Sequence, residues 1–192
     1  MPTLAETGTQ PTASRDATAG YEVLPGRVPR EAVDTALRHI HLDIARRGLP
    51  PEELATWLWN AHWFPHLKWD AEIVALLDHL PVELREGDVC DPQLVLQLPD
   101  EHTGGALEPH IDQEPDWAAG RTYRRIVGVA LTAGRESNGG LVVWPLHGGD
   151  PVSVALEPGD VVVMDPRLPH TSGFNREGGI RYAAYFRFLE SR

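Results

Sequence analysis

The chain contains a single cysteine, Cys90, so no disulfide can form within it. It lacks an apolar run of about 20 residues, the length that a bilayer-spanning helix needs. It also lacks the shorter apolar segment typical of a secretory signal. We therefore expect a cytoplasmic protein with no membrane partner.

Basic residues are scarce, because 17 Lys and Arg stand against 28 Asp and Glu and give a formal net charge of -11. Nucleic acids and anionic membranes select basic surfaces, so neither is expected as the main partner. What is present is an ordinary globular composition, with 42% hydrophobic residues over 192 positions. That length suits one domain with a sizeable core and leaves the oligomeric state unknown.

The N-terminal third changes character along its length. Residues 1–20 contain almost no large apolar side chain and are expected to form a disordered tail, followed by a single domain over 21–192. From Pro29, apolar residues recur at helical spacing until Gly48. A second helix is expected to open at Pro51, and a third to span Asp70 to Leu80, so that about 29–81 is helical.

After Gly87 the apolar spacing changes to two and the segments become short. The expected strands are 93–98, 106–111, 125–132, 141–144, 152–156, 161–164 and 181–189. Turn signals rich in Gly, Pro and Asp separate them. Because the helices come first and the strands follow in a run, the sequence predicts a mainly β fold, a sandwich or barrel flanked by N-terminal helices.

His110 and Asp112 stand two residues apart, so on a strand their side chains point to the same face. His170 follows 58 residues after Asp112. Two neutral imidazoles and one carboxylate occupy one face of an octahedral ferrous ion and leave three positions open for a chelating co-substrate and dioxygen. These three residues are the candidate metal ligands and catalytic residues.

Arg181 lies eleven residues after His170, on the next expected strand. There it would point back toward the same site, and its guanidinium with the Ser172 hydroxyl would form a forked receptor for a carboxylate. An arginine inside an apolar barrel needs an anion. Near His170, Asp165 and Arg167 either orient this histidine through a hydrogen bond or form a local surface pair.

Four fragments together resemble the iron(II)- and 2-oxoglutarate-dependent dioxygenases, specifically the phytanoyl-CoA dioxygenase-like branch. They are His110-Ile111-Asp112, Asn138 to Pro145, Pro158 to Asp165, and His170 to Arg181, within a match that covers His110 to Phe188. The resemblance implies a double-stranded β-helix, the jelly-roll fold of cupins. It also implies Fe(II) on His110, Asp112 and His170, and 2-oxoglutarate with its distal carboxylate on Arg181 and Ser172.

The same resemblance implies a reaction in which O2 is consumed, 2-oxoglutarate is decarboxylated to succinate, and an unactivated C–H bond is hydroxylated or desaturated. Related halogenases carry glycine or alanine in place of Asp112, so this carboxylate favours hydroxylation or desaturation over halogenation. Gln97, or Gln93 on the same strand, is the candidate for the co-substrate's proximal carboxylate. Leu131 stands where family members often carry a tryptophan that contacts the co-substrate.

Two other functions remain open. One is a cupin-type metal enzyme that uses no 2-oxoglutarate, and the other is a non-catalytic jelly-roll binding protein. The substrate of the leading hypothesis is a small organic molecule such as an amino acid, an acyl thioester or a natural-product intermediate. The metal site does not select among these, because loops set the substrate in such folds.

Three further groups have a structural explanation that competes with a functional one. His62 and His66 have helical spacing for a metal, but Pro65 breaks the helix and favours a packing role. Four tryptophans between Trp57 and Trp69 suit a helix-to-sheet core or the wall of a substrate site. The four arginines Arg121, Arg124, Arg125 and Arg135 suit a solvated loop or recognition of an anionic substrate.

Overall fold

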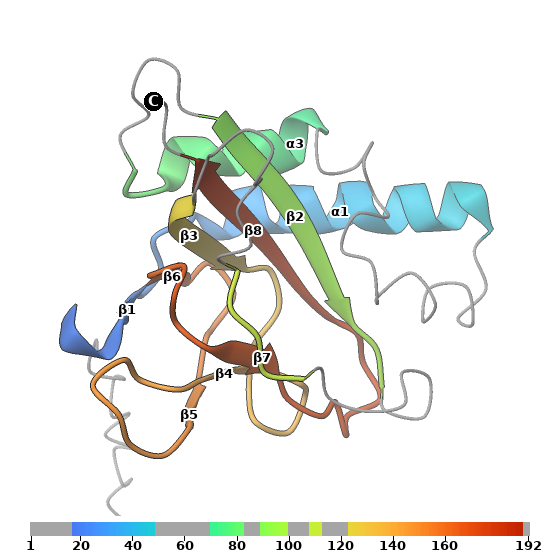
Figure 1. Cartoon of the computed structure of the whole chain (residues 1–192). Helices are drawn as coiled ribbons and strands as arrows, with labels where there is room; N and C mark the ends of the chain where they lie inside the picture. Colours follow the sequence, from blue (N-terminus) through green and yellow to red (C-terminus); the bar gives the residue numbers. More distant parts are fainter. Residues whose placement is uncertain (1–16, 49–69, 83–88, 100–107, 113–122, 190–192) are drawn as a thin grey trace, which may run out of the picture.

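The computed structural model describes residues 17–48, 70–82, 89–99, 108–112 and 123–189, and more of these residues lie in β-strands than in helices (Figure 1). None of the helices among them is long and apolar enough to cross a bilayer. The elements in chain order are η1 (Ala17–Ala19), β1 (Tyr21–Leu24), α1 (Arg30–Arg47), α3 (Ala71–Val74), η2 (Ala75–His79), β2 (Val89–Gln97), β3 (Tyr123–Ala130), β4 (Leu141–Val143), β5 (Val152–Val154), β6 (Val161–Met164), β7 (His170–Ser172) and β8 (Arg181–Leu189).

The strands form two antiparallel sheets. The larger sheet has the order β1-β6-β3-β8-β2, and the smaller has the order β5-β4-β7. The longest pairing joins β2 to β8, from Val89 opposite Leu189 to Gln97 opposite Arg181. An isolated bridge between His110 and His170 adds one more pairing beside β7, so the metal-ligand candidates lie at the smaller sheet.

Two apolar cores lie on opposite faces of the larger sheet. The helix-side core packs α1, α3 and η2 against one face, and the inter-sheet core joins the other face to the smaller sheet. Figure 1 shows these helices on one side of β3 and β8, and β4, β5 and β7 on the other. Phe186 and Phe188 are fully buried in the helix-side core. Burial of each such side chain stabilises the fold by about 1.5–3 kcal/mol.

Helix α1 forms where the apolar spacing predicts it. Val33, Ala36 and Ile40 are fully buried against the larger sheet. The helix follows Pro29 and ends at Gly48, which adopts the left-handed conformation with φ 61. Glycine accepts this conformation without the steric penalty of a Cβ, and so it terminates the helix.

The helix expected over Asp70 to Leu80 is also confirmed, in two pieces. The Asp70 carboxylate accepts the backbone N–H of Glu72 at 2.9 Å and caps α3, which continues directly into the tighter 3-10 turn η2. Ile73 and Leu76, one from each piece, are both buried in the helix-side core. Packing of this apolar face therefore persists although the backbone changes its hydrogen-bond pattern.

The structure differs from the expectation at several short segments. Residues 17–19 form a 3-10 helix with Ala19 buried, inside the stretch expected to be tail. The sequence predicts neither β1 nor β7, although it predicts β4, β5 and β6, which are equally short but consist mainly of valine between turn signals. Of the strand expected over 106–111, the described part contributes only the bridge at His110.

Other predictions fall on residues that the structure does not describe. They are the helix expected from Pro51, the pair His62 and His66, and the tryptophans from Trp57 to Trp69.

Gly159 should be essential for joining the N-terminal segment to the larger sheet. Its carbonyl accepts the N–H of Val28 at 2.9 Å, its φ is +93, and a Cβ there would lie 2.4 Å from the Val28 oxygen. We expect Gly159→Ala to lower the free energy of unfolding by about 2–4 kcal/mol, from left-handed strain and overpacking.

Urea unfolding of the full chain measures this change. Gly178→Ala is the matched control, because a Cβ at Gly178 would meet nothing within 4 Å and its φ is not left-handed. The control should shift stability by less than about 0.5 kcal/mol. Equal midpoints for the two variants would contradict the role given to Gly159.

Candidate metal and co-substrate site

His110, Asp112 and His170 come together although 58 residues separate the last two. One ligand atom from each lies within 4.8 Å of the others. The His110 Nε2 atom is 3.9 Å from Asp112 Oδ1, and the two imidazole centroids are 4.6 Å apart. His170 is buried and His110 is exposed, so one side of the group faces solvent.

Backbone pairing fixes the two histidines side by side. The N–H of His110 donates to the His170 carbonyl at 3.0 Å, and the N–H of His170 donates to the His110 carbonyl at 2.9 Å. Residues that exchange both bonds in this way hold their Cα atoms about 5.5 Å apart. His170 is also paired with Val143 of β4, so the smaller sheet holds both imidazoles in place.

The ring nitrogens of both histidines are arranged in the same way. His110 Nδ1 lies 3.0 Å from the Glu108 carbonyl oxygen, and His170 Nδ1 lies 2.9 Å from the Leu168 carbonyl oxygen. A carbonyl only accepts, so each Nδ1 carries the proton and each Nε2 keeps its lone pair. This is the tautomer that binds a metal through Nε2, with the outer hydrogen bond fixing the ring orientation.

Electrostatics keep His170 in its neutral form. Burial lowers the pKa of His170, while the hydrogen bond to Leu168 and the charge of Asp112 raise it and the neighbouring His110 lowers it. The net shift is downward. A neutral imidazole is the form that coordinates a metal, and the donor set of two imidazoles and one carboxylate suits ferrous iron.

Arg181 is a buried cation at the start of β8, with only 4% of its surface exposed. Its Nη2 donates to Ser172 Oγ at 3.1 Å, and its buried Nε has no hydrogen-bond partner. Burial lowers the pKa of Arg181, and the nearby Tyr185 partly offsets this effect. No carboxylate of the described residues pairs with this guanidinium. A buried charge without a counter-ion costs several kcal/mol of stability, so the surroundings of Arg181 fit an anion.

Ser172 connects the cation to the metal-ligand candidates. It lies two residues after His170 on β7, so both side chains are on one face of the strand, about 7 Å apart along it. The hydrogen bond from Arg181 to Ser172 therefore places the guanidinium one strand repeat from the candidate metal ligands. A short molecule with a carboxylate at one end and a chelating group at the other fits this spacing.

The two remaining candidates, Gln97 and Leu131, lie on opposite sides of the larger sheet. Gln97 is buried at the end of β2, directly opposite Arg181. A Cβ at Gly139 would lie 2.5 Å from Gln97 Cγ, so the turn at Gly139 packs against this glutamine. Leu131 is buried in the helix-side core, and we therefore leave it out of the proposed co-substrate site.

Asn175 belongs to the fragment His170 to Arg181, which resembles the family, but the sequence alone suggests no role for it. It is fully buried, and its Nδ2 donates to the carbonyls of Gln97 and Gly179, each at 2.8 Å. It therefore ties the loop between β7 and β8 to the end of β2 and positions Ser172 and Arg181. An asparagine in a glycine-rich turn could have indicated this role from the sequence, because such side chains form hydrogen bonds with nearby backbone groups.

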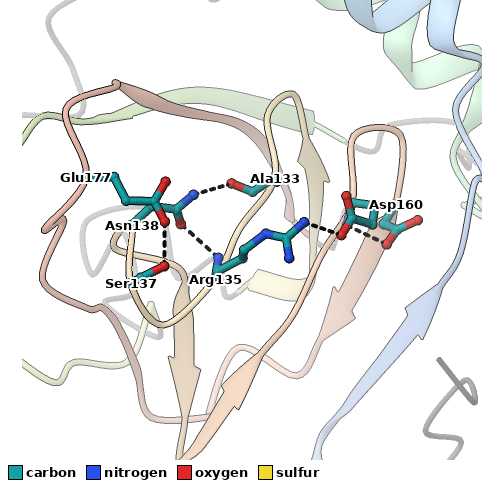
Figure 2. Close-up of polar contacts among 7 residues, drawn as sticks. Ala133, Arg135, Ser137, Asn138, Asp160 and Glu177 are labelled. Atoms are coloured by element: carbon teal, nitrogen blue, oxygen red, sulfur yellow. Dashed lines mark hydrogen bonds and ion pairs between the residues drawn. The ribbon is translucent and has the colours of Figure 1, made fainter. Parts of the chain in front are cut away.

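Arg135 forms an ion pair with Glu157. Its Nη2 is 2.8 Å from Glu157 Oε1, and its N–H donates to Asn138 Oδ1 at 2.8 Å (Figure 2). Both charged side chains are more than half exposed, so this ion pair is a surface contact. Arg125 is an exposed residue of β3, and Arg121 is outside the described part of the chain. The solvated-loop interpretation fits Arg135 better than anion recognition.

Asp165 and Arg167 form the local surface pair, which was one of the two interpretations left open by the sequence. Arg167 Nη2 lies 2.7 Å from Asp165 Oδ2, and the arginine side chain is 64% exposed. The hydrogen bond from Arg167 lowers the pKa of Asp165. His170 is oriented by the Leu168 carbonyl instead.

Comparison with known proteins gives no match to a family model and no match among curated proteins. Solved structures do match. EvdO2 from Micromonospora carbonacea var. aurantiaca complexed with 2-oxoglutarate is 19% identical, with a TM-score of 0.60 over 91% of this chain and 88% of that chain. A Pseudomonas putida prolyl-4-hydroxylase is 17% identical, with a TM-score of 0.58 over 92% of this chain and 95% of that chain.

A third solved structure is the non-heme alpha-ketoglutarate-dependent epimerase SnoN from nogalamycin biosynthesis. It is 16% identical, with a TM-score of 0.59 over 91% of this chain and 79% of that chain. At these identities the likeness establishes the fold. The resemblance to iron and 2-oxoglutarate enzymes that the sequence predicts is thus confirmed at the level of fold.

Proposed function

We propose that this chain is an iron(II)- and 2-oxoglutarate-dependent oxygenase that hydroxylates an unactivated C–H bond of a small organic substrate. In this reaction O2 is consumed and 2-oxoglutarate is decarboxylated to succinate. The observation that carries the proposal is the open three-ligand group beside the buried Arg181, which has no counter-ion among the residues described. In a metal enzyme that needs no 2-oxoglutarate, this buried cation would need a different anion.

The order of the strands supports a double-stranded β-helix core. From β2 onward the chain alternates between the sheets: β2 and β3 are in the larger sheet, and the His110 bridge between them joins the smaller. The pair β4 and β5 is then in the smaller sheet, β6 in the larger, β7 in the smaller and β8 in the larger. We propose that these strands form a jelly roll that holds the site between its two sheets.

Iron(II) would be held by Nε2 of His110, Nε2 of His170 and one carboxylate oxygen of Asp112. Three protein ligands leave three positions for co-substrate and dioxygen. When bound, iron with 2-oxoglutarate supplies the oxidising power, and the protein supplies position and electrostatics. The carbonyls of Glu108 and Leu168 accept the Nδ1–H hydrogen bonds and would keep both rings oriented for Nε2 to bind iron(II).

The distal carboxylate of 2-oxoglutarate would be received by Arg181 and Ser172. The guanidinium then gains the counter-ion that its burial requires, and its Nε–H gains an acceptor. Gln97 is opposite Arg181 in the sheet, so we assign it to this distal end and not to the proximal carboxylate. The short spacing from Ser172 to His170 would let the keto acid end reach the metal.

The substrate class is open within this proposal. SnoN is described as an epimerase from nogalamycin biosynthesis, and another match as a prolyl-4-hydroxylase. By analogy we propose a natural-product intermediate or an amino acid derivative as substrate. As an iron ligand, Asp112 would fill a coordination position that a halide needs, which favours hydroxylation or desaturation over halogenation.

Anaerobic titration of the full chain tests the proposal. Iron(II) and 2-oxoglutarate together should give a weak visible charge-transfer band that neither gives alone. Under air, succinate release should rise with a suitable amino acid, acyl thioester or natural product, and the product should gain one oxygen in mass. Iron binding without the band would favour a 2-oxoglutarate-independent metal enzyme, and no iron binding would favour a binding protein.

A further inference from the structure

Thr132 lies just beyond the point where the regular pairing of β3 with β8 ends. The sequence predicts it as the last residue of a strand over 125–132, but β3 ends at Ala130. Beyond that residue, the N–H groups of Leu131 and Thr132 both donate to the carbonyl of Tyr182, at 3.1 and 3.2 Å. Two residues opposite one is the hydrogen-bond pattern of a β-bulge, a feature that is common next to active sites.

The Thr132 side chain completes the pairing at the start of β8. The N–H of Tyr182 donates to the Thr132 hydroxyl oxygen at 2.9 Å, and this oxygen also lies 3.5 Å from the Tyr182 carbonyl oxygen. Tyr182 is buried, so its N–H needs an acceptor within the protein. The hydroxyl of Thr132 therefore takes the place that a strand carbonyl has in a regular ladder.

Tyr182 is anchored on the face of the larger sheet that lies away from the candidate site. Its ring belongs to the helix-side core and meets the His41 ring edge-on, with 5.1 Å between the ring centroids. Its carbonyl accepts two N–H groups, and its own N–H is bonded to Thr132. The ring and both backbone polar groups together fix the position of Tyr182 in the sheet.

Arg181 immediately precedes this anchored residue. Successive side chains of a strand project to opposite faces, so Arg181 is directed toward the smaller sheet, where Ser172 lies. Among the described residues, the guanidinium makes one hydrogen bond, to Ser172 Oγ at 3.1 Å. One contact does not fix a long side chain, so the position of the guanidinium depends on where the backbone of β8 begins.

We propose that Thr132 is a positioning residue, whose hydroxyl holds the backbone of Tyr182 and thereby places Arg181 to receive the distal carboxylate of the co-substrate. This inference rests on the proposed function. A receptor group that is held in place before binding loses less conformational freedom when the ligand arrives, and a small misplacement of such a group lowers affinity. Thr132 acts on co-substrate affinity and not on iron, because its hydrogen bonds go to the backbone of β8 and not to the metal-ligand candidates.

The direct test is Thr132→Val in the full chain, because valine has nearly the shape of threonine and lacks the hydroxyl. The dissociation constant for 2-oxoglutarate, from the anaerobic charge-transfer titration, should rise about 5- to 30-fold, since the buried Tyr182 N–H without its acceptor displaces the start of β8. Iron(II) affinity, by chelator competition, should stay unchanged. Thr132→Ser keeps the hydroxyl and should restore the wild-type dissociation constant; a Thr132→Ser chain as weak as Thr132→Val would contradict the role of the hydroxyl.

Asp70→Ala is the control for a purely structural effect. The Asp70 carboxylate also accepts a backbone N–H, that of Glu72, but it caps α3 on the helix side of the larger sheet. Its loss should lower the thermal midpoint, as Thr132→Val does, and leave the dissociation constant for 2-oxoglutarate unchanged. Under air, Thr132→Val should raise the KM for 2-oxoglutarate at unchanged kcat, whereas a general loss of structure would lower kcat.

A double-mutant cycle shows whether Thr132 acts through Arg181. In the Arg181→Met background, Thr132→Val should add little to the dissociation constant for 2-oxoglutarate, because the group that it displaces is already absent. Its effect on the thermal midpoint should persist in this background, since the Tyr182 N–H still needs an acceptor. Fully additive effects on the dissociation constant would overturn the connection to Arg181.

The outcomes separate this inference from the function it rests on. A wild-type chain that gives no charge-transfer band defeats the proposed function, and the inference with it. A band in the wild type with an unchanged dissociation constant in Thr132→Val overturns the role of Thr132 alone. If Thr132→Val does not fold, Thr132→Ala, which also lacks the hydroxyl, carries the same expectation.

Discussion

Replacing Asp112 with alanine is expected to lower the rate of succinate release by more than about 100-fold. Loss of an outer partner of a metal ligand already costs about 10- to 100-fold in metal affinity or activity, and Asp112 is proposed as a ligand itself. It is also the only carboxylate in the His110, Asp112 and His170 group. Without it, two neutral imidazoles remain, and iron(II) loses the anionic donor that offsets its charge.

Iron(II) affinity, by competition with a chelator under anaerobic conditions, should fall together with the rate. Asp165→Ala is the control, since this carboxylate precedes His170 by five residues but pairs with the exposed Arg167. It should change the rate by less than about threefold, because exposed ion pairs contribute at most about 1 kcal/mol. A rate within threefold of wild type in Asp112→Ala would remove Asp112 from the metal site.

The sequence predicts the long elements of this fold, and it predicts short strands only where they consist mainly of valine between turn signals, as in β4, β5 and β6. The stripe through Val33 and Ile40 and the alternation of 181–189 each extend far enough for their period to be recognised. β1 and β7 have four and three residues, and pairing with β6 and β4 is what makes them strands. Such pairing is a tertiary property, and short sequences do not encode it locally.

The candidate site could likewise be predicted from the sequence only in part. The spacing of His110, Asp112 and His170, taken with the fragments that resemble the family, predicts them as metal ligands, and the structure brings them within one cluster. The structure places Leu131 in the helix-side core, and the sequence alone does not say which face of an alternating strand meets the helices. The close approach of the Tyr185 ring to Gly128 depends on the register of β3 against β8, although a glycine inside an apolar strand is a visible signal in the sequence.

Arg181→Met should change co-substrate affinity and stability in opposite directions. Truncating one partner of a buried, hydrogen-bonded charge pair costs about 2–5 kcal/mol, so the dissociation constant for 2-oxoglutarate should rise at least about 30-fold. Iron(II) binding should persist, because Arg181 is not in the three-ligand group. The charge-transfer titration measures the dissociation constant for 2-oxoglutarate, and chelator competition measures iron(II) binding.

Without ligands, the free energy of unfolding of Arg181→Met should rise by about 1 kcal/mol or more, since replacing a buried charge with a packed apolar side chain is often stabilising by about 1–4 kcal/mol. Iron(II) with 2-oxoglutarate at 100 times its dissociation constant should stabilise the wild type by about 2.7 kcal/mol and the variant far less. The order of stability of the wild type and Arg181→Met should therefore reverse when iron(II) and 2-oxoglutarate are both added.

Arg176→Met, at an exposed arginine over the Phe174 ring, should show no reversal. A less stable ligand-free Arg181→Met would mean that Arg181 serves the fold, whereas the reversal would show that its buried charge serves binding.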